Sequence, residues 1–169
     1  MSHMFAIGLI RPVTDGVHHA LDLGCGKGFD TIYLRSLGYT VTPVDNEKHF
    51  EDAVISDIRD FNIEKGKYEV IICNNVLSFL HNKNDIERII RNIVKGLSPG
   101  GVAFFTVFGP NSTKHYPNMT LYDYEEILHF VESLPVEIMS KSTIEGYIKN
   151  LLGKIIYEHS HKFTVKSRG

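Results

Sequence analysis

The sequence has 169 residues, enough for one domain with its own core and short for two. A hydrophobic share of 43% and a charged share of 22% are ordinary for a globular protein, so disordered and membrane-embedded classes are disfavoured. The formal charge of -2 gives no general electrostatic attraction to nucleic acid, and we expect a single domain over residues 1–169 with no nucleic-acid partner.

Cysteine usage and the lack of long apolar runs exclude further classes. Cys25 and Cys73 lie far apart without CxxC spacing, which disfavours a disulfide framework and a zinc site, so no metal is expected. No apolar run approaches the ~20 residues that cross a bilayer, and no signal peptide is visible after residues 1–4, which resemble an expression remnant. We predict a cytoplasmic protein without a membrane partner, either a monomer or a homodimer.

Strand-like and helix-like patterns alternate through the first two thirds of the chain. Short apolar strands are predicted at residues 19–23, 39–45, 68–74 and 102–108, and helices at 29–37, 84–97 and 124–134. The segment 46–56 has room for two helical turns and a stub of strand. Strands that alternate with helices indicate a parallel sheet with helices on its faces.

Local signals suggest where these elements end. Gly38 is expected to end the first helix as a C-terminal cap, and Asp30 and Thr31 are expected to cap its start. Asn84 followed three positions later by Glu87 predicts a capping box for the second helix.

The chain ends with two strand-like runs, at residues 136–148 and 155–165. A Gly153-Lys154 connection before the second run predicts an antiparallel hairpin. The fold class is therefore α/β, a Rossmann-like doubly wound sheet with strands 1–5 parallel and an antiparallel C-terminal strand pair.

The most informative motif is the loop at residues 22–28, with the sequence Asp-Leu-Gly-Cys-Gly-Lys-Gly. A phosphate-binding P-loop is excluded because Lys27 is followed by glycine rather than Ser or Thr. A dinucleotide fingerprint is disfavoured because the third glycine comes one place early and Phe29 stands in its position. Asp22, at the end of the first strand, would repel a pyrophosphate but would bind a cationic ammonium group.

A second carboxylate completes the interpretation. Asp45 ends the second predicted strand, where a carboxylate can accept hydrogen bonds from both ribose hydroxyls. The ligand is then a nucleoside with an amino-acid-like cation and no phosphate. S-adenosylmethionine fits this description, with S-adenosylhomocysteine as its product.

These residues resemble the motifs of class I S-adenosylmethionine-dependent methyltransferases. Five segments match in order within residues 18–109: 22–28, 44–46, 56–58, 68–80 and 97–101. The Leu-Gly-Cys-Gly sequence, the segment 76–80 and the short C-terminal hairpin are similar to the tellurite-resistance methyltransferase group.

The resemblance implies in-line methyl transfer from S-adenosylmethionine to a small-molecule acceptor. It places the methionine moiety at Asp22, Gly24, Cys25, Gly26 and Gly28, and the ribose at Asp45 and Asn46. The adenine is expected at Asp57 and Ile58, and the acceptor side at Asn74 and Asn75. Only eleven residues separate Asp45 from Asp57, fewer than the family usually has, and Asp57 fits a turn cap equally well.

No motif identifies a general base. His81, His115 and Tyr116 follow the fourth and fifth predicted strands and are candidates, although a structural role is commoner for such histidines. Three alternative functions are weighed. A NAD-type oxidoreductase is disfavoured by Asp22 and Phe29, and a macromolecule methyltransferase would need a basic face. A non-catalytic nucleoside-binding module stays open.

Overall fold

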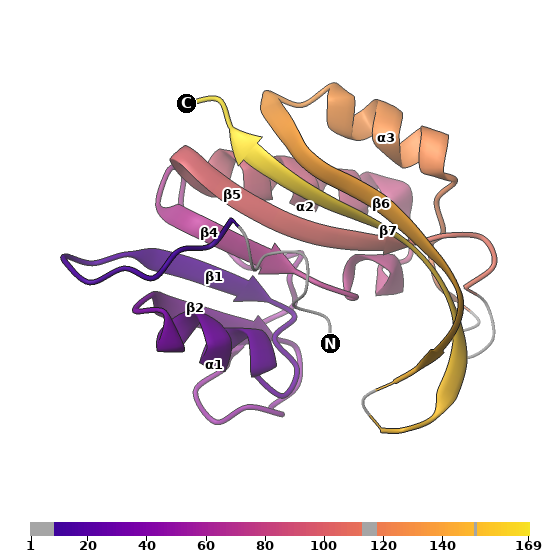
Figure 1. Cartoon of the computed structure of the whole chain (residues 1–169), viewed down its shortest axis with the longest axis horizontal. Helices are drawn as coiled ribbons and strands as arrows, with labels where there is room; N and C mark the ends of the chain where they lie inside the picture. Colours follow the sequence, from indigo (N-terminus) through magenta and orange to yellow (C-terminus); the bar gives the residue numbers. More distant parts are fainter. Residues whose placement is uncertain (1–8, 113–117, 151) are drawn as a thin grey trace.

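The computed structural model describes residues 9–112, 118–150 and 152–169 of the chain. Its elements are β1 (His19–Leu23), α1 (Phe29–Ser36), β2 (Thr40–Asp45), β3 (Val54–Ile55), β4 (Tyr68–Cys73), the 3-10 helix η2 (Leu77–Phe79), α2 (Lys83–Gly96), β5 (Leu97–Phe108), α3 (Tyr124–Glu132), β6 (Val136–Lys149) and β7 (Ile155–Ser167). The strands form one seven-stranded sheet in the order β3-β2-β1-β4-β5-β7-β6 (Figure 1).

The pairing of the strands confirms the predicted fold class. Strands β1 to β5 are parallel to one another, whereas β7 runs antiparallel to both β5 and β6. Because the parallel strands share a direction, β1 and β4 end at the same edge of the sheet (Figure 1). In open α/β sheets ligands bind at this carboxyl edge.

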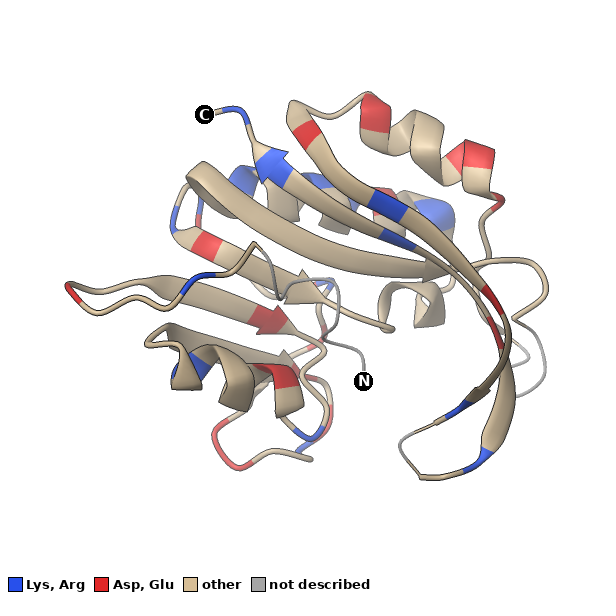
Figure 2. Ribbon diagram, viewed as in Figure 1, with Lys and Arg blue, Asp and Glu red and all other residues tan. Residues whose placement is uncertain are grey.

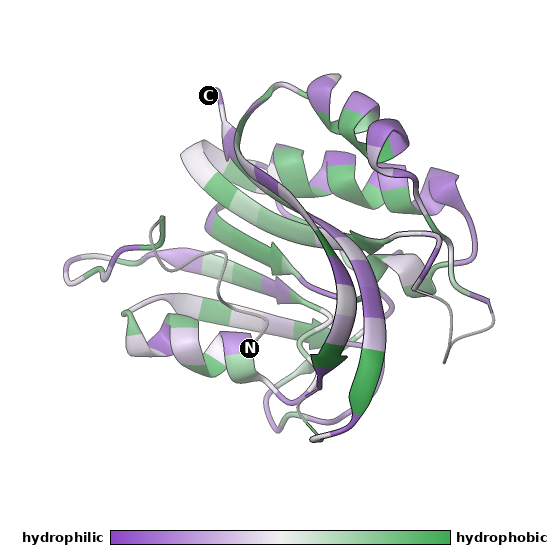
Figure 3. Cartoon of the chain, turned by 45° about the vertical axis from the view of Figure 1, so that its right-hand side comes forward, coloured by the Kyte–Doolittle hydropathy of each residue, from purple (hydrophilic) through white to green (hydrophobic). Residues whose placement is uncertain are grey.

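Helices cover both faces of the sheet, and side-chain alternation along each strand sorts the core into two layers. In β1, Ala20 packs in the same cluster as Leu34 of α1, whereas Leu21 packs in the cluster that contains α2 and α3. Both residues are fully buried, as expected for a strand covered on both faces. Figure 3 shows the result as hydrophobic stretches along the central strands and mixed colours on α2 and α3.

The start of α2 differs from the predicted capping box. The N-cap is Asn82, whose side-chain oxygen accepts a hydrogen bond from the Asp85 backbone N–H at 2.8 Å. Asn82 has the extended backbone that an N-cap needs, with φ -152° and ψ 155°, whereas Asn84 already lies inside the helix. The box predicted at Asn84 and Glu87 is therefore wrong by two residues.

The segment after β2 is less regular than predicted. Residues 46–53 form bends and turns in place of the predicted helical turns, whereas the predicted stub of strand is confirmed as the two-residue β3. Even so, Val54 pairs with Val44, and the Ser56 N–H donates to the Asp45 carbonyl at 2.9 Å. This short strand therefore still brings residues 56–58 beside the end of β2.

Two smaller differences concern β5 and the closing hairpin. Strand β5 begins at Leu97, so the Pro-Gly-Gly segment lies within the start of this strand instead of before it. The pairing of β5 with β4 shifts register there, between Tyr68 and Val70 of β4. The predicted hairpin is confirmed, although β6 ends at Lys149 and β7 begins at Ile155, so the strands are further apart along the chain than the predicted two-residue connection. Its far end curves away from the sheet, beyond the carboxyl edge (Figures 1 and 3).

Candidate active site at the carboxyl edge

The glycine loop between β1 and α1 adopts a conformation that depends on glycine. Gly24 and Gly28 have φ values of +72° and +81°, in the left-handed region that other residues rarely adopt. A Cβ on Gly24 would lie 2.7 Å from the Val76 side chain, and one on Gly28 would lie 2.4 Å from the Phe50 ring. The loop is therefore packed against two other segments and leaves its backbone close to any bound ligand.

Asp45 is bound to this loop. Its Oδ2 accepts the Gly26 backbone N–H at 2.8 Å, and its Oδ1 accepts the Glu47 backbone N–H at 3.0 Å. Each carboxylate oxygen has two acceptor positions, so one remains on each after these contacts. The half-buried carboxylate is thus held in one orientation and can accept two further hydrogen bonds.

Asp22 lies deeper, under the loop. It is 2% exposed, and its Oδ2 accepts a hydrogen bond from the Thr31 hydroxyl at 2.6 Å. Burial raises the pKa of Asp22 to about 7, with Asp30 and Asp45 adding to the rise and Thr31 opposing it. Thr31 therefore supports Asp22 and does not cap α1, whose N-cap Gly28 receives no side-chain hydrogen bond.

A cavity of about 190 Å³ opens beside the loop. Five of the predicted cofactor residues line it: Gly24, Asp45, Asn46, Asp57 and Ile58. The rest of the wall comprises Arg59 and a group that follows β4, namely Val76, Phe79, Leu80 and His81. The cavity thus combines carboxylates and apolar side chains, as small-molecule sites do.

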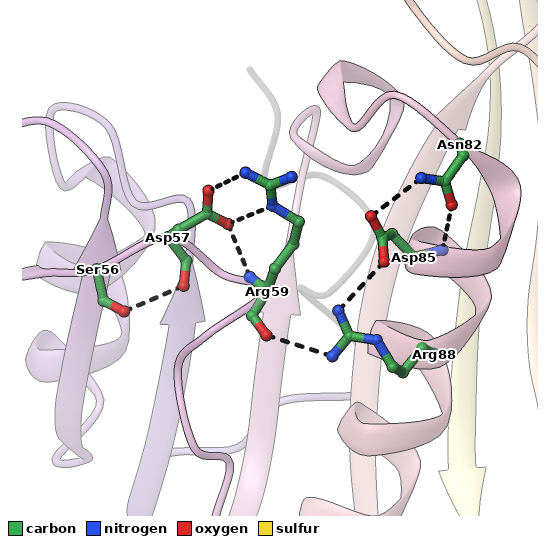
Figure 4. A network of polar contacts seen from close by, with 6 residues as sticks. All are labelled: Ser56, Asp57, Arg59, Asn82, Asp85 and Arg88. Carbon is green, nitrogen blue, oxygen red and sulfur yellow. Dashed lines mark hydrogen bonds and ion pairs between the residues drawn. The ribbon is translucent and has the colours of Figure 1, made fainter.

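Asp57 belongs to a polar network that Figure 4 shows from close by. Its Oδ1 accepts both the Arg59 backbone N–H at 2.9 Å and Arg59 Nε at 3.0 Å, and its Oδ2 accepts Arg59 NH2 at 2.6 Å. Hydrogen bonding to Arg59 lowers the pKa of Asp57, so this carboxylate is ionised at neutral pH. Sequence reasoning missed Arg59, although the Asp-x-Arg spacing was visible.

Asn74 and Asn75 follow β4, the strand next to β1. Asn75 has a φ of +57°, a left-handed conformation that asparagine tolerates better than most residues. Asn74 Nδ2 donates to Asp30 Oδ2 at 3.4 Å, and Asn74 Oδ1 accepts the Thr106 hydroxyl at 3.4 Å. A polar row therefore runs from α1 across β4 to β5 at the carboxyl edge.

The predicted general-base candidates are placed only in part. His81 is exposed and lies on the cavity wall with Asp57, whereas His115 and Tyr116 lie outside the described residues.

A family model described as a methyltransferase domain matches residues 11–146. The chain belongs to this family. Its fold is that of class I S-adenosylmethionine-dependent methyltransferases, which confirms the family and fold predicted from the sequence. S-adenosylmethionine is accordingly the cofactor of this methyltransferase domain, as predicted.

Three relatives illustrate the likeness. YqeM of Bacillus subtilis (strain 168) is 27% identical over 126 residues, which cover 66% of this chain and 51% of YqeM. TehB of Haemophilus influenzae (strain 10810) is 36% identical over 95 residues, which cover 48% of this chain and 32% of TehB. The crystal structure of TehB from H. influenzae matches with a TM-score of 0.77 at 21% identity, covering 97% of this chain and 60% of that one. The resemblance to the tellurite-resistance group is thus confirmed.

The third relative is a Burkholderia thailandensis 1,6-didemethyltoxoflavin-N1-methyltransferase, crystallised with 1,6-didemethyltoxoflavin and S-adenosylhomocysteine. It matches with a TM-score of 0.72 at 17% identity, covering 99% of this chain and 76% of that one. The chain spans only part of the length of these curated relatives, 51% of YqeM and 32% of TehB.

The methyltransferase domain has a cysteine in its glycine loop that packs as an apolar residue. Cys25 is 8% exposed, and burial raises the pKa of its thiol to about 12. Because the thiolate is the reactive form, Cys25 is not a nucleophile at neutral pH. Among the described residues there is no cluster of three or more His, Cys, Asp or Glu that could hold a metal, and no helix long and apolar enough to cross a membrane.

Proposed function

We propose that this domain transfers a methyl group from S-adenosylmethionine to a small-molecule acceptor by in-line displacement. The observation that carries the proposal is the contact between the Gly26 N–H and Asp45 Oδ2, at 2.8 Å. This hydrogen bond joins the glycine loop, which lacks phosphate-binding features, to a carboxylate that lines the cavity. The arrangement suits a ligand whose ribose binds the carboxylate and whose remaining part lies close to the glycine backbone.

In this proposal the residues bind the cofactor in order along the carboxyl edge. Asp45 accepts hydrogen bonds from the ribose hydroxyls, with Asn46 beside it, and Asp57 and Ile58 contact the adenine. The methionine moiety lies against the backbone of Gly24, Cys25, Gly26 and Gly28, beside the buried carboxyl group of Asp22, and its reactive end reaches Asn74 and Asn75.

The chemistry asked of the protein is small. When bound, S-adenosylmethionine supplies an already activated methyl group. The chain's contribution is to hold the acceptor in line with it, and such positioning is worth several kcal/mol of the barrier. In this proposal the acceptor lies beside the polar row formed by Asp30, Asn74 and Thr106. Because His81 lies on the cavity wall with Asp57, we assign it to the nucleoside side rather than to proton transfer.

Two observations support a small acceptor. No helix or strand among the described residues carries Lys or Arg without an acidic residue, and α3 carries acidic residues without Lys or Arg (Figure 2). The B. thailandensis relative, which shares the fold, was crystallised with a small heterocyclic acceptor. We extend the proposal to a cytoplasmic protein that acts as a monomer or homodimer.

The test begins with binding and ends with turnover. Calorimetric titration should show heat with S-adenosylmethionine and S-adenosylhomocysteine but none with NAD; heat with NAD alone would contradict the proposal. Methyl-labelled cofactor is then incubated with panels of thiols, amines, carboxylates and metalloid oxyanions, and labelled product is expected from at least one. Tight cofactor binding without any product would favour a non-catalytic binding module.

A further inference from the structure

The nucleobase end of the cavity contains an ion pair between two residues of one turn. Asp57 and Arg59 both line the cavity, and Arg59 directs a backbone N–H, Nε and NH2 at the Asp57 carboxylate. The two side-chain contacts are bidentate, a geometry that fixes the plane of the carboxylate as well as its distance (Figure 4).

This geometry limits what the carboxylate can still do. A carboxylate has about four acceptor positions, two on each oxygen. Arg59 fills both positions on Oδ1 and one on Oδ2, so within the described residues Oδ2 keeps a single acceptor position. An ionised carboxylate has no proton to donate. Asp57, which lines the cavity, therefore has one acceptor position left and no donor.

The backbone of Arg59 is held by residues of α2. Its carbonyl accepts a hydrogen bond from Arg88 NH1 at 3.2 Å, and Arg88 NH2 donates to Asp85 Oδ1 at 3.3 Å. The other oxygen of Asp85 accepts from the side chain of Asn82, the N-cap of α2, at 3.1 Å. The turn after β3 is thus connected to the start of α2, directly after His81 on the cavity wall (Figure 4).

Stability alone is a weak reason for this pair. The side chains of Arg59 and Asp57 are 41% and 31% exposed, and ion pairs at such exposure contribute little to folding. Their place on the cavity wall suggests a role in recognition instead.

We propose that Arg59 is a positioning residue for base selection: by fixing Asp57 with one acceptor directed to the cavity, it selects a 6-amino purine over a 6-oxo purine. The inference rests on the proposed function. The amino group of adenine donates to Oδ2, whereas the 6-oxo group of hypoxanthine places an acceptor against an acceptor. Losing one hydrogen bond to a charged group corresponds to roughly a 10- to 150-fold change in affinity.

The test measures the affinity of S-adenosylhomocysteine and S-inosylhomocysteine for four proteins by calorimetry. The unchanged domain is expected to prefer the adenine ligand roughly 10- to 150-fold. Arg59→Met should reduce this preference to within about threefold, whereas Arg59→Lys should keep part of it, because a lysine keeps the positive charge and can donate to the carboxylate but lacks the planar fork of arginine. Arg91→Met is the matched control, since Arg91 is an exposed α2 arginine beside Glu87 and outside the network, and it should change neither affinity.

The outcomes separate the inference from the proposed function. An unchanged base preference in Arg59→Met would overturn the inference, as would tighter adenine binding, which would mean that the guanidinium obstructs the base. If the unchanged domain binds both ligands equally, the cofactor site stands and the inference fails; if it binds neither, the proposed function fails. Asp57→Asn, which replaces one acceptor oxygen with a donor, should also narrow the preference and serves if Arg59→Met does not fold.

Discussion

At the scale of a single residue, Asp45 both contacts the glycine loop and lines the cavity beside it. It holds Gly26 and Glu47 through backbone N–H groups and has one acceptor position left on each oxygen. Asp45→Ala is expected to weaken S-adenosylhomocysteine binding by on the order of 1.5–3 kcal/mol, the range for hydrogen bonds to a charged group. Calorimetry checks this, with Asp52→Ala as control because Asp52 pairs with Arg35 away from the cavity lining. Unchanged affinity would mean that the ribose is held elsewhere.

Asp22 makes stability depend on pH in a direction that can be worked out. Its pKa rises from an ordinary 3.8 to about 7 in the folded chain, so between those values the folded state binds the proton more tightly than the unfolded state. Stability from this group is complete below about pH 4 and is lost as the pH rises through about 7. Ionisation of the buried Asp22 carboxyl group therefore lowers the stability of the folded chain.

Replacing Asp22 with asparagine should remove that dependence. Asp22→Asn still offers an oxygen to Thr31 but cannot ionise, so we expect it to be more stable than the unchanged domain at about pH 8, by on the order of 1–4 kcal/mol. At about pH 4 the advantage should disappear. Urea unfolding at both pH values measures the difference, and an equal advantage at both would show that ionisation of Asp22 is not its cause.

At the scale of elements, the glycine loop allows two effects of a Cβ to be separated. Gly24→Ala adds left-handed strain and a Cβ 2.7 Å from Val76, whereas Gly66→Ala adds the same strain, at φ +68°, with nothing within 4 Å. Both should destabilise the fold, since alanine at positive φ costs more than about 1 kcal/mol. Only Gly24→Ala should also abolish cofactor binding. Equal loss of binding in both variants would contradict a specific role of the loop.

The regular elements were predictable because their signals are local and periodic. Helix α2 carries Ile86, Ile89, Ile90 and Ile93 at helical spacing, and all four are buried. Its cap was not predictable from pattern alone, because Asn82 and Asn84 both fit an N-cap and only the backbone decides between them. The predicted helical turns after β2 failed for a similar reason: pairing of Val44 with Val54 determines that segment, and this pairing is not local.

In the candidate site, too, the residues with local sequence signals were predictable and those that depend on distant contacts were not. Asp22 and Asp45 lie at the ends of the neighbouring strands β1 and β2, and the glycines follow β1, so their convergence could be predicted from the pattern of strands. Arg59 could not be found this way, because its role depends on a side chain two residues away and on Arg88, which is far along the chain.

At the scale of the whole molecule, the cavity depends on segments that are separated along the chain, because Asp45 ends β2 and His81 follows β4. A ligand that binds there stabilises only the folded chain. S-adenosylhomocysteine at 100 times its Kd should therefore add about 2.7 kcal/mol. For a domain of this size that raises Tm by very roughly 5–10 °C. Differential scanning fluorimetry measures the shift; Asp45→Ala at the same concentration should show a smaller one, and NAD none. A shift of equal size in Asp45→Ala would place the ligand outside this cavity.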